Sequence, residues 1–150
     1  MVLGNTDGSA LSWFSRDRGI LVTRHGRVVQ SAGFVQNVKN TRFLDDDPLA
    51  AGPVREPVTA RRQVDIEPGD LFGIVLTCTI TPEGSQDIET PGAHHQTERL
   101  REHCKAPLIG WSFDNQFWQD PRTGYVWKSI QTLVPSQPPL TLTTGRPPAT

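Results

Sequence analysis

Residues 58–80 read VTARRQVDIEPGDLFGIVLTCTI and carry the strongest secondary-structure pattern of the chain. Apolar residues take alternate positions in its first nine residues, interrupted by Arg62, and this period of two predicts a strand with one wet face. Turn formers at 67–70 lead into LFGIVLTCTI at 71–80, which predicts a second strand paired with the first as an antiparallel hairpin. Four residues on one face of this second strand are expected in the core: Phe72, Ile74, Leu76 and Ile80.

A second hairpin is predicted from FWQDPRTGYVW at 117–127. The segment Asp120-Pro121-Arg122-Thr123-Gly124 fits a type I turn, in which proline sets φ to about −65° and glycine supplies a left-handed residue where the next strand resumes. Aromatic residues on both arms are expected on both faces of the hairpin. Some of these rings should therefore fill the core while the others face outward.

Turn-forming residues also divide the first third of the chain. His25-Gly26 lies between two β-branched runs, 20–23 and 27–30, and predicts a tight hairpin in which His25 is a turn residue. Residues 40–57 are expected to form a loop with a short helical turn at 48–51.

The second half of the chain has weaker patterns. Residues 81–97 are polar and rich in turn formers, and ERLREHC at 98–104 fits a helix as well as a strand. Residues 135–150 read as a proline-rich C-terminal tail, whose last few residues are expected to be disordered. Within that tail only 140–143 can add to a sheet, at its edge.

The composition favours many short strands. The chain has 150 residues, 35% hydrophobic residues, 13 glycines and 13 prolines, so we predict a single domain, 1–150, with an all-β fold: an antiparallel β-sandwich or open barrel with long loops. Fifteen basic residues against 16 acidic ones leave no cationic face for nucleic acid. The longest apolar run, 71–78, is only strand length, so no segment is expected to span a bilayer.

The two cysteines, Cys78 and Cys104, allow several interpretations. They form a disulfide if the protein lies outside the cytosol, and otherwise remain two free thiols. A nucleophilic role is disfavoured because Cys78 lies on the apolar face of its strand. A zinc site is disfavoured because the chain lacks a Cys-x-x-Cys pair and because adjacent residues in a strand point to opposite faces. That zinc set would add three histidines to the cysteines: His94, His95 and His103.

Other acidic residues suggest sites that their spacing does not support. Asp45-Asp46-Asp47 lacks the alternating ligands and distal glutamate of a calcium loop, so a solvated acidic loop is expected. Glycoside hydrolysis needs two carboxylates across a cleft, and no spacing singles out a pair. The available candidates are Asp65, Asp114 and Asp120. We expect no bound metal, no cofactor and no catalytic residue.

Aromatic residues near the C-terminal hairpin form the main candidate binding surface. Aromatic faces with polar neighbours bind sugar rings, although packing in the core and between strands is the more ordinary role of such residues. The candidate contacts for a glycan or a partner protein are Trp111, Trp118, Tyr125 and Trp127.

Three blocks of sequence resemble one known family. They are GILVTRHGRVVQSAGF at 19–34, DPL at 47–49 and NQFWQDPRTGYVWKSIQTLVPSQPPLTLTTGRPP at 115–148. In this order they resemble the group 4 capsule polysaccharide lipoprotein family, also called the YjbF or GfcB family. The matching positions read as architectural: Leu21, Val22, Thr23, Gly26, Arg27, Asp47, Pro48, Leu49, Trp118, Asp120, Thr123 and Gly124.

The resemblance implies a β-rich periplasmic domain held at the outer membrane by a lipidated N-terminal cysteine. Its implied role is that of a non-enzymatic accessory protein in capsule or exopolysaccharide production and export. The implied partners are other assembly proteins of that pathway or the polysaccharide itself. The alternative is a polysaccharide-acting enzyme or a carbohydrate-binding β module.

The start of the chain departs from the family pattern. MVLGNTDGSALSW shows no signal peptide and no lipid-bearing cysteine, and Val2-Leu3-Gly4 resembles a point already inside the family domain. We therefore expect an N-terminally truncated member, from a late-called start codon or a fragment.

Overall fold

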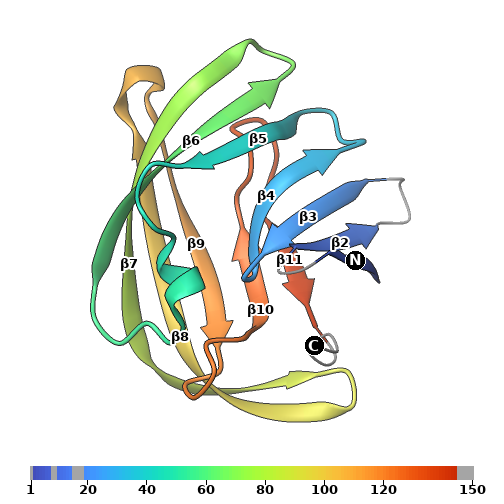
Figure 1. The fold of residues 1–150 in the computed structure, drawn as a ribbon, viewed down its shortest axis with the longest axis vertical. Coiled ribbons are helices and arrows are strands. Elements are labelled where there is room, and N and C mark those ends of the chain that lie inside the picture. Colours follow the sequence, from blue (N-terminus) through green and yellow to red (C-terminus); the bar gives the residue numbers. More distant parts are fainter. Residues whose placement is uncertain (1, 8–9, 15–18, 145–150) are drawn as a thin grey trace.

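The structure, a computed structural model, describes residues 2–7, 10–14 and 19–144, and in these ranges it is built of antiparallel β-strands. A four-stranded sheet has the order β1-β2-β3-β4, and a seven-stranded sheet has the order β11-β10-β9-β8-β7-β6-β5. Figure 1 shows the large sheet curling into a half-barrel beside the small sheet. The predicted all-β antiparallel fold is confirmed.

The elements are β1 (Val2–Asp7), β2 (Ala10–Phe14), β3 (Ile20–Arg24), β4 (Arg27–Ala32), β5 (Asn37–Phe43), η1 (Pro48–Ala51), β6 (Val58–Glu67), β7 (Leu71–Thr90), β8 (Ala93–Ala106), η2 (Pro107–Ile109), β9 (Trp111–Gln119), β10 (Val126–Gln131) and β11 (Leu140–Thr143).

The core lies on the inner face of the large sheet. Its first cluster joins buried residues of β5 to β8, including Val38, Ile66 and Leu76. In a second cluster Leu49 of η1 packs with Leu100 and Phe117, so the short helix covers the inner face of β8 and β9.

The small sheet packs across this core through β4. Val28 and Leu21 pack with Leu142 of β11. The side chain of Gln131 on β10 accepts a hydrogen bond from Val28 N at 2.9 Å and donates one to Gly26 O at 2.8 Å. These contacts fix β4 against the β10–β11 end of the large sheet, and Thr41 Oγ1 of β5, at the other end, donates to Val29 O at 2.7 Å.

The 58–80 hairpin forms as predicted, with one correction to its core face. Leu76 and Ile80 are buried, but Phe72 is 52% exposed and Ile74 only half-buried. The register explains this, because Val64 faces Ile74 whereas Ile66 faces Leu71, so β7 holds one extra residue. This is a β-bulge at Gly73, whose φ of 64° suits glycine, and it turns Leu71 inward in place of Phe72.

Two predicted irregular segments are strands. Residues 40–43 belong to β5, which pairs with β6, and residues 81–97 belong to the long β7–β8 hairpin that turns at Pro91-Gly92. Many residues of this hairpin's outer part are exposed on both faces, so their sequence shows no apolar alternation. Residues 98–104, which fit either a helix or a strand, belong to β8 and pair with β7.

The predicted turns are confirmed. His25 and Gly26 both have positive φ and join β3 to β4, and Asp120–Gly124 joins β9 to β10 with Gly124 at φ 83°. The 48–51 helical turn forms as η1, and β11 lies at the sheet edge. The expected disorder at the end of the tail falls outside the described residues. No helix in the described ranges is long and apolar enough to cross a membrane.

Candidate functional site

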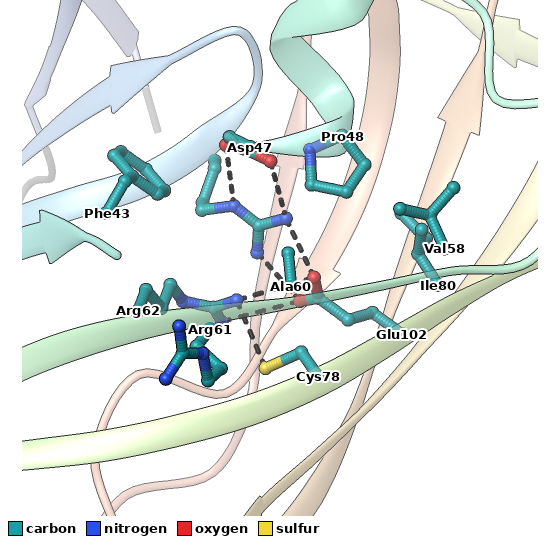
Figure 2. A pocket seen from close by; sticks show the side chains of 11 residues that line it. Phe43, Asp47, Pro48, Val58, Ala60, Arg61, Arg62, Cys78, Ile80 and Glu102 are labelled. Carbon is teal, nitrogen blue, oxygen red and sulfur yellow. Dashed lines mark hydrogen bonds and ion pairs between the residues drawn. The ribbon is translucent and has the colours of Figure 1, made fainter. Parts of the chain in front are cut away.

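Four charged side chains lie buried together on the inner face of the half-barrel. Arg27 comes from the first position of β4, Asp47 from the residue that caps η1, Arg62 from β6 and Glu102 from β8. None is more than 8% exposed. Figure 2 shows three of them, labelled Asp47, Arg62 and Glu102, around a small pocket. We call these four residues the buried charge network.

Arg27 is the centre of this network. Its guanidinium donates to both carboxylate oxygens of Asp47, at 2.9 and 3.1 Å, and to both of Glu102, at 2.7 Å each. Such paired, charge-assisted bonds fix the orientation of both carboxylates. The guanidinium also lies 5.4 Å from the ring centroid of Phe117. One side chain thus ties the small sheet to the η1 segment and to β8.

Arg62 lies on the other side of Glu102. It donates to the two Glu102 oxygens at 3.4 Å each and to the sulfurs of Cys78 and Cys104 at 3.2 and 3.7 Å. Asn115 donates a further bond to Glu102 Oε1 at 2.9 Å. Each Glu102 oxygen therefore has more than one donor.

The network holds Arg27 and Glu102 in the charged form. Burial by itself would raise the pKa of Glu102, but Arg27 and Arg62 outweigh it and hold that pKa well below its ordinary value. Burial would likewise lower the pKa of Arg27, yet Glu102 and Asp47 hold it above its usual range. The pKa of Arg62 is lowered by burial and by repulsion from Arg27. Two cations and two anions make the network neutral.

The space around the network is too small for a substrate. The pocket between Arg27, Arg62, Glu102 and neighbouring side chains has room for about one water molecule. Ligand sites for small molecules usually enclose roughly 300 Å³ or more. Both carboxylates are already saturated by arginine donors, so the arrangement supports packing between strands and offers no free acid or base.

Cys78 and Cys104 face each other across β7 and β8, with Cα atoms 4.1 Å apart, and the structure joins them as a disulfide. Together with Glu102 they form a group whose ligand atoms lie within 4.8 Å of one another. Sulfurs joined in a disulfide cannot bind a metal as thiolates, and the Glu102 oxygens accept hydrogen bonds from arginine. This group is therefore not arranged to bind a metal.

The three histidines of the considered zinc set lie elsewhere. His103 is next to Cys104 but points to the opposite face, where it meets Asp114 at 2.6 Å. His94 pairs with Glu89 at the exposed end of the β7–β8 hairpin, and His95 stacks on an indole ring. The histidines and cysteines are therefore not brought together.

The aromatic residues of the 117–127 hairpin occupy both faces, as predicted. Phe117 is fully buried on the inner face, while Trp118 and Trp127 pack with Ile88 in a separate cluster that Tyr125 borders. The tip of the β7–β8 hairpin covers this cluster. His95 stacks on Trp127 at 3.6 Å between centroids, and Trp118 Nε1 donates to Gln86.

Exposure differs among the four candidate contact residues. Trp118 and Trp127 are 5% and 9% exposed, whereas Trp111 and Tyr125 are partly exposed. Burial raises the pKa of the Tyr125 hydroxyl. Trp127 Nε1 is buried and has no hydrogen-bond partner. Trp111 lies apart from the other three and packs on Phe113 at 4.5 Å.

The candidate catalytic carboxylates are separate from one another. Asp65 accepts a hydrogen bond from Gly73 N at the β7 bulge. Asp120 accepts one from Arg122 N inside its turn. Burial would raise the pKa of Asp120, but the hydrogen bonds from Arg122 and Thr123 outweigh it and lower that pKa. Asp114 pairs with Arg101 on the outer face. Each has a local structural role. The triple aspartate is not the solvated loop that we expected, because Asp47 is buried against Arg27.

Part of the buried charge network has a signal in the sequence. Arg62 and Glu102 both stand at inward positions of alternating strands, between apolar neighbours on the same face. Two opposite charges at inward positions indicate a buried ion pair. Arg27 and Asp47 have no comparable pattern, since both adjoin turns.

Comparison with known proteins gives one consistent result. The family described as group 4 capsule polysaccharide lipoprotein gfcB, YjbF matches residues 1–144. The uncharacterized lipoprotein GfcB of Escherichia coli (strain K12) is 24% identical over 149 residues, which cover 98% of this chain and 70% of the relative. The crystal structure of the hypothetical lipoprotein YmcC from Escherichia coli (K12) superposes with a TM-score of 0.85 at 23% identity, covering 99% of this chain and 77% of that one.

Proposed function

The chain belongs to the group 4 capsule polysaccharide lipoprotein family of GfcB and YjbF, and on that premise we propose that it is a non-enzymatic accessory protein of capsule or exopolysaccharide production and export. We further propose that it acts at the periplasmic face of the outer membrane, a location that the family's description as lipoproteins supports. The family match over residues 1–144 is the observation that carries this proposal.

The geometry of the interior supports a role without catalysis. The most deeply buried charges, Arg27 and Glu102, bind each other and leave space for about one water molecule. The three exposed or turn carboxylates considered for hydrolysis are each held by a different local partner. Such an interior suits a scaffold that presents a surface to a partner.

A carbohydrate-binding role is the alternative. Trp118, Tyr125 and Trp127 form one cluster, but Trp118 and Trp127 are only 5% and 9% exposed and His95 covers one face of Trp127. In this role the partly exposed Tyr125 would be the main contact for a glycan.

Gene deletion tests the proposed function. We expect the deletion strain to lose surface polysaccharide and the full-length gene to restore it. An unchanged polysaccharide level would overturn the assignment to this pathway.

A second assay separates the accessory role from the enzymatic alternative. The purified chain is incubated with polysaccharide extracted from the same strain, and the reducing ends and the polymer size are measured. We expect both to stay constant. New reducing ends that increase with protein concentration would overturn the non-enzymatic role.

A further inference from the structure

Three exposed apolar side chains mark one end of the half-barrel. Among the described residues, the three most exposed large hydrophobic side chains are Leu108 at 101%, Val35 at 83% and Phe72 at 52%. Leu108 lies in η2 between β8 and β9, Val35 in the turn between β4 and β5, and Phe72 just after the turn between β6 and β7. We call these three residues the apolar rim.

Strand pairing places the three turns at the same end. Asn37 pairs with Glu67, and Gln36 Nε2 donates to Pro68 O at 2.9 Å, so the β4–β5 and β6–β7 turns are neighbours. Thr77 pairs with Lys105, so β8 runs towards that end and reaches η2 there. Figure 1 shows the β6–β7 and β8–β9 turns at the top of the molecule and the β4–β5 turn at its upper right.

The opposite end is polar. Its turns contain His25-Gly26, Pro91-Gly92 and the segment 120–124, which carries Asp120 and Arg122. Isolated surface hydrophobics are common, but their concentration on the turns of one end is informative. In β7 the bulge at Gly73 places Phe72 outside the core. The turns at the two ends therefore differ in polarity.

We infer that the apolar rim inserts into the surface of a lipid bilayer. The three side chains project from three separate segments, the β4–β5 turn, the start of β7 and η2, whereas a stable protein partner usually needs a continuous patch of roughly 800 Å². A fluid bilayer surface accepts separated apolar points without matching their shape. The family's description as lipoproteins places its members beside a membrane, and this inference does not depend on a role in polysaccharide export.

The charged residues beside the apolar rim indicate that binding to lipid does not depend on electrostatic attraction. The turn segments 33–36, 67–70 and 107–110 contain two charged residues, Glu67 and Asp70, and both are acidic. The exposed Lys39 and Lys105 flank two of these segments and balance the two acidic residues. Anionic lipid should therefore not strengthen binding. The contact should depend on apolar area and should persist in high salt.

Vesicle sedimentation of the 150-residue chain tests the inference. We expect the chain to sediment with phosphatidylcholine vesicles, and no more strongly when phosphatidylglycerol is added. The combined substitutions Val35→Ser, Phe72→Ser and Leu108→Ser should weaken this partition at least about tenfold. The matched control is Val58→Ser, a 41% exposed apolar residue at the opposite end of β6, which should leave partition unchanged.

The single variant Leu108→Ser keeps the test independent of folding, since this side chain is fully exposed and its loss cannot open the core. It should also weaken partition, at an unchanged melting temperature. Leu108→Trp should show a blue-shifted emission when vesicles are added. Failure of the folded chain to sediment would overturn the inference and favour a protein partner for the rim. Equal sedimentation of the triple variant and the parent chain would overturn it as well.

Discussion

Replacing Arg27 by methionine removes the centre of the buried charge network while keeping a long apolar side chain. The carboxylates of Asp47 and Glu102, at 8% and 2% exposure, then lose their shared partner. Arg62 remains near Glu102, with donor distances of 3.4 Å, but Asp47 loses both guanidinium bonds.

The expected loss is large for this size of protein. Removing one partner of a buried ion pair costs about 3 to 5 kcal/mol, because the remaining charge stays buried without compensation. Domains of this kind have a free energy of unfolding of about 5 to 15 kcal/mol in total. At about 2 to 4 °C per kcal/mol, the melting temperature should fall by about 6 to 20 °C.

Urea unfolding followed by tryptophan fluorescence measures this free energy. The matched control is Arg61→Met. Arg61 is the sequence neighbour of Arg62 and forms an exposed pair with Asp45, so its loss should leave the urea midpoint almost unchanged. Adding Asp47→Asn to Arg27→Met should recover part of the loss, since the carboxylate stranded at position 47 is then neutral while Arg62 still pairs with Glu102. A cost below about 1 kcal/mol for Arg27→Met would refute the view that the network holds the sheets together.

Three further predictions concern acid, a turn and the disulfide. The pKa of Glu102 in the folded chain lies below its ordinary value of 4.5, so as pH falls the unfolded chain binds a proton at this residue first. The free energy of unfolding should therefore fall as pH drops below about 4.5. The fall should be less steep in Glu102→Gln. Gly124→Val should cost about 2 to 5 kcal/mol, since φ is 83° and the new Cβ would lie 2.7 Å from the Gly52 backbone; an unchanged urea midpoint would contradict this. Mass analysis under denaturing, non-reducing conditions should find Cys78 and Cys104 joined in periplasmic protein, and two free thiols would count against this. Reduction should lower the free energy of unfolding by about 3 kcal/mol, since the cysteines are 26 residues apart.

Much of the fold follows from local pattern in the sequence. Alternation in 58–80 and the turn formers at 25–26 and 120–124 predict three hairpins that the structure contains. These features act over a few residues, because turn geometry and strand period are properties of neighbours in the chain.

The errors come from effects that a local pattern does not contain. The bulge at Gly73 changes which residues at the start of β7 face inward, and this moves Phe72 out of the core. The outer β7–β8 hairpin has no apolar alternation, and therefore resembles a loop in sequence. Arg27 and Glu102 are 75 residues apart, so only the closed sheets reveal that they meet.

We propose that the buried charge network stabilises the fold and that the functional residues lie on the surface. Surface polysaccharide in a strain carrying Glu102→Gln at matched levels of folded protein tests this claim most directly. Glutamine keeps the shape and the acceptor oxygen of Glu102 but removes the charge, so any acid–base chemistry would be lost. We predict output equal to that of the parent strain. Loss of output by a protein that is still folded and present at the same level would contradict the account.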